Sequence, residues 1–235
     1  MTRTKLGRTL VGAALTVVLS TFTLAPAHAE AYPDISWDAT ITDGATYTYG
    51  EVPAEADQGC IATEEGVAVE CLVTGYSAEL GTHELVATAV SATNELLVSR
   101  LTMTYTVASR YSYGNGFLPP AKDGKTYKAG RAIPLKFKLW AGEDKAKDAA
   151  VVTGIMAQQV DCTTTAPLAD AVAVTGNGKG TQLKFHDGAF HQKWKTGKLP
   201  KPEKAKGKKT RTMACYLVTV SLDDGSSFNA QFQLR

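Results

Sequence analysis

Hydrophobic and polar residues alternate along much of the chain, and a period of two is typical of β-strands that bury one face. The pattern is clearest over Leu101–Val107, where apolar residues alternate with three threonines. Leu85–Val90 comes before this segment across a polar Ser91–Asn94 turn, which predicts a β-hairpin. Shorter β-rich segments lie at residues 35–41, 47–52 and 67–73. Several short strands at close spacing predict a β-sandwich here.

The second half of the chain shows the same period. Apolar and polar positions alternate in the order Ile133, Pro134, Leu135, Lys136, Phe137, Lys138, Leu139. Pro134 predicts an edge strand or a strand start, because proline cannot donate a ladder hydrogen bond. Residues 217–222 and 228–234 predict a final hairpin with its turn at Asp223-Asp224-Gly225, for which a calcium site is the alternative interpretation.

Charge divides the chain into two parts, although the whole sequence has a net charge of only +2. Residues 30–109 carry 13 acidic residues and one basic residue, a net charge of −12, and residues 110–235 carry 21 basic and 10 acidic residues, a net charge of +11. We therefore expect an acidic domain at residues 30–109 and a basic domain at residues 125–235. Glycines and prolines predict a linker and the start of the second domain at residues 110–124.

Residues 1–29 are typical of a cleaved signal peptide. A basic start precedes an apolar run from Thr9 to Leu24 and an Ala27-His28-Ala29 cleavage site. An uncleaved anchor is the alternative, and the cleavage site argues against it. No later stretch approaches 18 apolar residues, so no membrane span is expected in the mature chain. We expect a secreted, extracellular protein that associates with the cell wall or stays free.

The cysteines become interpretable once export is expected, because thiols outside the cytosol are generally oxidised. Four cysteines allow three connectivities. The division into two domains selects Cys60 with Cys71 and Cys162 with Cys215. Each bridge would stabilise its domain by about 2 to 4 kcal/mol.

The first domain resembles the bacterial immunoglobulin-like modules of exported proteins. The resemblance, over residues 33–109, is carried by Cys60, Cys71, Val73–Ser77, Gly81–Leu85, Ala87–Ala89 and Thr104–Val107. Such a module implies a β-sandwich fold. It also implies that His83 opens a core strand and is structural, since no second metal ligand lies at a recognisable spacing.

The second domain resembles an exported bacterial domain named PxKF for its Pro-x-Lys-Phe signature. Gly116–Pro120 and Lys128–Leu139 carry the match, which continues through Cys162, Trp194 and Cys215 to the final hairpin at the end of the chain, over residues 111–235. The resemblance implies a β-rich module of secreted or cell-surface proteins without an assigned activity. The departure lies between Thr196 and Cys215, where the connection is longer and rich in lysine.

Residues 193–211, the lysine loop, hold nine basic residues and one acidic residue. Two prolines, two glycines and charge repulsion predict a solvated loop that projects between strands. It could be a solvated insertion without a specific role, a binding site for an anionic polymer of the cell envelope, or a contact for the acidic domain. The candidate polyanion-binding residues are Lys198, Lys201, Lys204, Lys206, Lys208, Lys209 and Arg211. Specific nucleic-acid binding is not expected, because Trp194 is the loop's one aromatic residue and is predicted to lie in the core.

The chain contains no recognisable catalytic motif. His186 and His191 could form a weak metal site near Asp187, but the stronger prediction is that they flank a hairpin turn at Asp187-Gly188. We assign no catalytic residue, no cofactor and no metal. The sequence predicts an all-β protein of two tandem immunoglobulin-like β-sandwich domains. Its predicted role is non-catalytic, as a structural, adhesive or polymer-binding protein at the bacterial cell surface, with envelope polymers or other surface proteins as partners.

Two alternatives stay open. A carbohydrate-binding accessory module would need an exposed row of aromatic side chains, for which Trp37, Tyr111, Tyr113 and Trp140 are the candidates. A minor extracellular hydrolase that uses two carboxylates needs no motif that a sequence would reveal.

Overall fold

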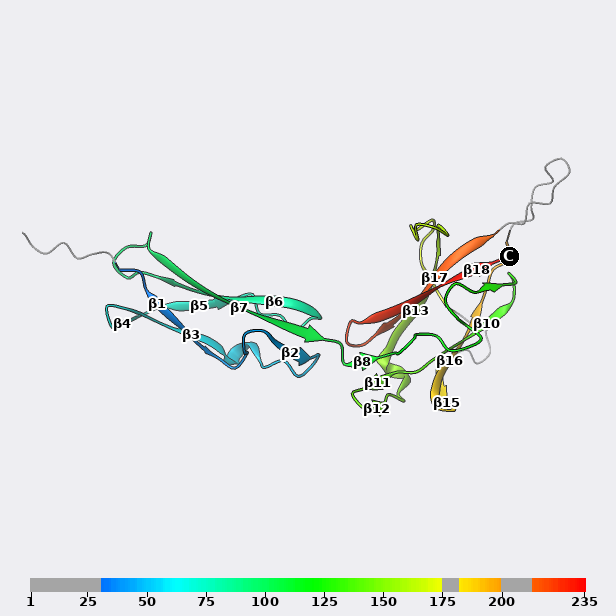
Figure 1. Cartoon of the computed structure of the whole chain (residues 1–235), viewed down its shortest axis with the longest axis horizontal. Coiled ribbons are helices and arrows are strands. Elements are labelled where there is room, and N and C mark those ends of the chain that lie inside the picture. The colour runs from blue at the N-terminus through cyan, green and yellow to red at the C-terminus, as the bar shows by residue number, and fades with distance from the viewer. Residues whose placement is uncertain (1–30, 175–181, 200–212) are drawn as a thin grey trace, which may run out of the picture.

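The computed structural model describes residues 31–174, 182–199 and 213–235 (Figure 1). The described residues form strands and two short 3-10 helices, η1 (Glu55–Asp57) and η2 (Ala149–Val151), and no α-helix. The strands pack as sandwiches, so the predicted all-β sandwich fold is confirmed. The predicted signal peptide, residues 1–29, lies outside the described residues.

The first sandwich contains seven strands in two sheets. One sheet has the order β1–β3–β4, and the other has the order β2–β7–β6–β5. The strands are β1 (Asp34–Ala39), β2 (Ala45–Thr48), β3 (Gln58–Glu64), β4 (Val67–Val69), β5 (Cys71–Thr74), β6 (Gly81–Val90) and β7 (Val98–Ala108). The hairpin predicted around Ser91–Asn94 is β6 and β7. β2 pairs in parallel with β7, a long-range contact that the sequence pattern did not reveal.

Between these two sheets lies a small core. Its buried residues are Ile41, Leu85, Met103, Tyr105 and Val107. The Tyr105 hydroxyl donates to the Ser77 carbonyl at 2.7 Å and accepts from the Ser77 amide at 2.8 Å. These two hydrogen bonds satisfy the Tyr105 hydroxyl, so the side chain can be buried in the core.

The described residues of the second sandwich form three sheets. Their orders are β14–β13–β17–β18–β9, β10–β16–β15 and β12–β11–β8. The strands are β8 (Tyr111–Ser112), β9 (Thr126–Tyr127), β10 (Ala132–Phe137), β11 (Trp140–Ala141), β12 (Asp144–Lys145), β13 (Val152–Val160), β14 (Val172–Ala173), β15 (Lys184–His186), β16 (Ala189–Lys195), β17 (Ala214–Leu222) and β18 (Ser227–Leu234). β10 is an edge strand, as Pro134 predicts, and the final hairpin is β17 and β18.

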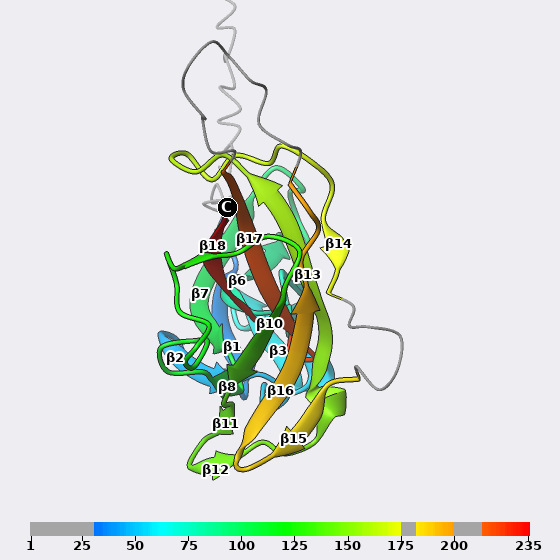
Figure 2. The same cartoon turned by 90° about the vertical axis from the view of Figure 1, so that its right-hand side faces the viewer.

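Aromatic side chains dominate the second core. Phe137 stacks on Phe190 with ring centroids 5.3 Å apart, and Phe117 meets both Phe137 and Phe232 edge-on. Figure 2 shows β10 and β16 side by side, with β13, β17 and β18 behind them. This core is separate from that of the first sandwich, so each sandwich buries its own hydrophobic cluster.

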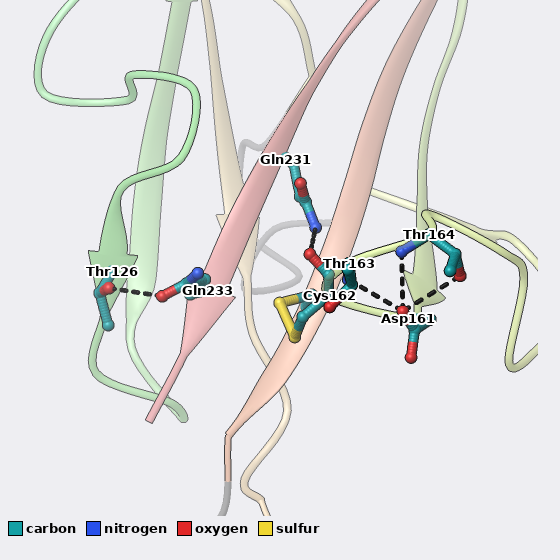
Figure 3. Close-up of a disulfide and its surroundings, with 8 residues drawn as sticks. Thr126, Asp161, Cys162, Thr163, Thr164, Gln231 and Gln233 are labelled. Carbon is teal, nitrogen blue, oxygen red and sulfur yellow. Dashed lines mark hydrogen bonds between the residues drawn. A yellow bond between two sulfur atoms is a disulfide. The ribbon is translucent and has the colours of Figure 1, made fainter.

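Both predicted disulfides are present. Cys60 and Cys71 join β3 to β5, one strand from each sheet of the first sandwich, with Cα atoms 5.9 Å apart. Cys162 and Cys215 have Cα atoms 5.2 Å apart and tie the segment after β13 to β17 (Figure 3). Gln231 of β18 donates to the Cys162 carbonyl at 3.2 Å, which fixes the same segment a second time.

The segment 110–124, expected as a linker and domain start, packs into the second core. Tyr111, Phe117 and Ala121 are all buried there. The glycines and prolines of this segment lie in turns between the three buried residues. The composition is therefore that of a linker, but the segment is a folded part of the second sandwich. The change from one sandwich to the other takes place at Ser109 and Arg110, between β7 and β8.

Candidate functional site

The sheet β10–β16–β15 has an apolar inner face and a basic outer face. Core residues of β10 and β16 point inward. On the outer face lie Lys136 of β10, Lys184 and His186 of β15, and His191, Lys193 and Lys195 of β16, and we call this set the basic face. The alternation of side chains along a strand forces this division, because each outward residue sits between inward ones.

The strand register gathers residues that are far apart in the sequence. Lys136 is opposite His191, and His191 is opposite Lys184 on its other side, so the three form one row across the sheet. Neighbouring strands lie about 4.8 Å apart, which brings three basic groups from three strands close together. Lys193 lies opposite Pro134 in the next row of the same face.

No lysine of the basic face has a carboxylate within 4.0 Å in the part of the chain that the structure describes. His186 Nδ1 contacts Asp187 Oδ2 at 3.1 Å at the tip of the β15–β16 hairpin, and this contact is an ion pair when His186 is protonated. Lys184, Lys193 and Lys195 are exposed. Uncompensated charges of one sign on one face raise the local positive potential, and such a surface attracts anions.

A cleft of about 360 Å³ opens on this face. It is lined by Pro134, Leu135, Lys136, Gln182, Lys184, His186, His191, Gln192 and Lys193. The rings of His186 and His191 stack within it, with centroids 3.6 Å apart and planes inclined by 20°. The cleft therefore combines ammonium and imidazole groups and is open to solvent through its exposed lysines.

The environment of His191 favours a neutral ring. Burial lowers the pKa of His191 below the usual histidine value, and the nearby His186 and Lys136 lower it further, against smaller opposing effects of the His186 carbonyl and Asp187. Its Nε2 atom is buried and makes no hydrogen bond to any residue the structure describes. Such atoms are rare in folded proteins and mark places where a polar partner is to be expected.

The loop predicted over residues 193–211 is wrong at its start, because Lys193 and Lys195 belong to strand β16 and lie on the basic face. Trp194 is buried, as predicted, and packs against Tyr216 and Phe232. Lys198 is exposed just beyond the strand. The other candidates, Lys201, Lys204, Lys206, Lys208, Lys209 and Arg211, lie outside the described residues. Sequence reasoning missed Lys136 and Lys184 as members of a site, although their alternation with core residues was visible.

The remaining candidates have structural roles. His83 contacts the Glu79 carbonyl at 2.7 Å and packs against the Tyr105 ring. Asp187-Gly188 is the predicted hairpin turn, and Asp223-Asp224-Gly225 is the turn between β17 and β18. Among the described residues, no group of three His, Cys, Asp or Glu side chains could hold a metal ion. Within the same residues, no helix is both long enough and apolar enough to cross a membrane.

The aromatic candidates for carbohydrate binding do not form an exposed row. Tyr111 is buried in the second core, Tyr113 stacks on Phe228, and Trp37 packs against the first core. Trp140 is half-buried on β11 and lies opposite Ser112, so it shares a row with Ser112 and not with Tyr111 or Tyr113.

Comparisons with known proteins show weak likeness only. No family model and no curated protein matches the chain. Among solved structures, a titin immunoglobulin tandem is 10% identical with a TM-score of 0.25, and 86% of this chain and 95% of that one are covered. A lipoprotein from Bacteroides thetaiotaomicron is 12% identical with a TM-score of 0.25, with 84% and 98% covered.

A third similar structure is a surface glycan-binding protein from a Bacteroides ovatus mixed-linkage glucan utilization locus, in complex with a heptasaccharide. It is 11% identical with a TM-score of 0.25, and the match covers 88% of this chain and 48% of that one. TM-scores this low do not support any transfer of function. The resemblance to a bacterial immunoglobulin-like module and a PxKF domain stays a prediction.

Proposed function

We propose that the protein is a secreted, non-catalytic binding protein of the bacterial cell surface that attaches to anionic polymers of the envelope. The basic face of β10–β16–β15 is the observation that carries this proposal, because its lysines have no carboxylate partner among the described residues. The two disulfides agree with an oxidising compartment outside the cytosol.

The rigidity of the basic face favours it as the centre of the binding site. Lys136, Lys184 and Lys193 extend from paired strands, so their backbone positions are fixed before a ligand arrives. Preorganised groups lose less conformational entropy on binding than groups on a loop do. In this proposal Lys198, which is exposed just beyond β16, adds to the positive surface of the sheet.

Attachment through clustered lysines depends on salt. Each lysine that neutralises a polymer charge releases a counterion, so affinity falls as the salt concentration rises. We expect the mature protein to bind purified anionic wall polymer, with a steep loss of affinity between 50 and 200 mM salt. No binding at 50 mM salt would contradict the proposed function.

The contribution of the basic face is tested by a matched pair of variants. Lys184→Gln, Lys193→Gln and Lys195→Gln together should reduce the slope of log affinity against log salt by about 2 to 3, since each charge contributes about 0.7 to 0.9. The control variant replaces Lys122, Lys145 and Lys147, which are also exposed lysines of the second sandwich, by glutamine. It removes the same charge and should leave the slope nearly unchanged. Equal effects of the two variants would show that net charge, and not this face, binds the polymer.

A further inference from the structure

The stacked histidines lie in the middle of the basic face, where further lysines would have given stronger attraction at neutral pH. His191 shares a row with Lys136 and Lys184, and His186 lies on the same hairpin above it. Attraction of anions at neutral pH therefore does not explain why these two positions are histidines. Histidine is the residue whose ordinary pKa allows it to change charge between pH 5 and 8.

We propose that the cleft binds one oxyanion group of the polymer and that the histidine pair takes up a proton as the group binds. This inference rests on the proposed function and specifies how the same site recognises its ligand. The oxyanion is a phosphate or a carboxylate, which present the same chemistry of negatively charged acceptor oxygens.

The charges that face His191 come from each strand packed beside it. Lys136 lies across on β10, Lys184 and His186 lie across on β15, Lys193 is two residues further along β16, and Asp187 sits at the hairpin turn. In the free protein, burial first and then the nearby His186 and Lys136 lower the pKa of His191, which favours the neutral ring. An oxyanion brought into the cleft would reverse this balance, because a nearby negative charge favours the imidazolium form.

Protonation also changes what the ring can donate. A neutral imidazole has one N–H donor, and an imidazolium has two. The Nε2 atom of His191 is without a hydrogen-bond partner among the described residues, and His186 keeps Nδ1 against Asp187. A proton taken up with the oxyanion gives the ring that receives it a second N–H donor, in a cleft that then contains an acceptor. Binding and proton uptake therefore strengthen each other, as linkage requires.

The sign of the pH effect follows from this coupling. The bound state has the higher histidine pKa, so affinity rises as pH falls through that value and levels off below the pKa of the free protein. If the pKa rises by about one unit on binding, affinity should increase about fivefold between pH 7.5 and pH 5.5. Lysine does not titrate in this range.

The experiment uses the mature protein with two probes, short-chain inorganic polyphosphate and poly-L-glutamate. Proton NMR follows the imidazole resonances of His186, His191 and His83 during a pH titration, with and without saturating probe. We expect the pKa values of His186 and His191 to rise with a probe that binds, and the pKa of His83, which lies in the first sandwich, to stay the same. The probe that produces the shift identifies the phosphate or the carboxylate as the group recognised.

A variant and its control complete the test. His186→Gln with His191→Gln should remove the pH dependence of polyphosphate or polyglutamate affinity and retain the binding due to the lysines. His186→Gln alone, at an exposed position, should weaken the pH dependence if the double variant fails to fold. His83→Gln should leave it intact.

The outcomes separate this inference from the function on which it rests. Binding of either probe without a change in the pKa of His186 or His191 would overturn the inference and leave the proposed function standing. If neither probe nor wall polymer binds at any pH, the proposed function fails and the inference fails with it.

Discussion

Asp224 is a carboxylate with no exposed surface at the boundary between the two sandwiches. Its Oδ2 accepts hydrogen bonds from the Ser109 hydroxyl at 2.8 Å and the Arg110 amide at 2.9 Å, and its Oδ1 accepts from the amide and hydroxyl of Ser226. Burial alone would raise its pKa, but these hydrogen bonds outweigh it and lower the pKa below 3.8. These four hydrogen bonds give the Asp224 side chain a structural role in the turn.

Asp224→Asn tests this role. An amide group cannot accept hydrogen bonds with its nitrogen, so two of the donors lose their partner and we expect a loss of about 1 to 3 kcal/mol in the free energy of unfolding. Urea denaturation at pH 7 measures this loss, and Asp144→Asn, at an exposed position on β12, is the control. Because the folded pKa is lowered, the stabilising effect of Asp224 is complete above the unfolded pKa and is lost as pH falls through the folded value. The difference between wild type and variant should therefore shrink below about pH 4, and a difference that grows in acid would contradict this assignment.

A second buried carboxylate shows the same principle in the first sandwich. Glu64 at the end of β3 accepts hydrogen bonds from Ser91 at 2.6 Å, from the Ala92 amide at 2.9 Å and from Thr93 at 3.1 Å. The bond from Ser91 is the largest effect on the Glu64 pKa, which is lowered. The polar turn that the sequence marked between β6 and β7 is thus held by a residue 27 positions earlier, which no local pattern could show.

Among the elements, strands with strict alternation were predictable and short strands were not. β6, β7, β10, β17 and β18 each alternate a buried with an outward residue, and each was found from the sequence. β3 was missed because Gln58 and Gly59 break its pattern at the start. The two-residue strands β8, β9, β11, β12 and β14 are too short to show a period in the sequence.

The candidate site shows the same division. The basic residues of the lysine loop are close together in the sequence, so a count of charges along the chain is enough to identify them. The basic face joins Lys136 to Lys184 and Lys193, which are about 50 residues away, and only the strand register brings them together. A single sequence specifies which residues of a strand point outward, but it does not show which strands become neighbours.

The two disulfides should stabilise their sandwiches to different extents. Cys162 and Cys215 close a loop of 53 residues, and Cys60 and Cys71 close one of 11. In the chain-entropy account the longer loop stabilises by about 4 kcal/mol and the shorter by about 3 kcal/mol. Cys162→Ala with Cys215→Ala should therefore destabilise the second sandwich more than Cys60→Ala with Cys71→Ala destabilises the first.

Guanidinium unfolding followed by tryptophan fluorescence separates the two effects. Trp37 reports on the first sandwich, and Trp140 and Trp194 report on the second. Each double variant should shift the transition of its own sandwich and leave the other within about 0.5 kcal/mol, since distant sites add independently. A shift of both transitions by either variant would show that the sandwiches unfold as one unit.

At the scale of the whole molecule, two sandwiches of opposite charge lie end to end, with β7 leading directly into β8 (Figure 1). Net charges of −12 and +11 suggest mutual attraction, but exposed charges are screened beyond about 8 to 10 Å at physiological salt. Short-range contacts hold the junction instead. The Arg110 amide bonds to Asp224 of the second sandwich, and its guanidinium bonds to the Tyr49 carbonyl of the first at 3.4 Å and lies 5.6 Å from the centre of the Tyr49 ring.

Arg110→Ala should therefore loosen the junction without unfolding either sandwich. The variant keeps the backbone bond to Asp224 and loses the contacts to Tyr49, which at an accessible site contribute about 0.5 to 1 kcal/mol. Residual dipolar couplings measured for each sandwich should show one common alignment in wild type and two different alignments in the variant. Arg100→Ala, at an exposed position on β7, is the control and should behave as wild type.

The same measurement in 0.5 M salt distinguishes the two causes of a fixed orientation, because short-range contacts survive screening and attraction between net charges does not. If the two sandwiches of the wild type show different alignments at high salt, attraction between their net charges, and not Arg110, fixes their relative orientation.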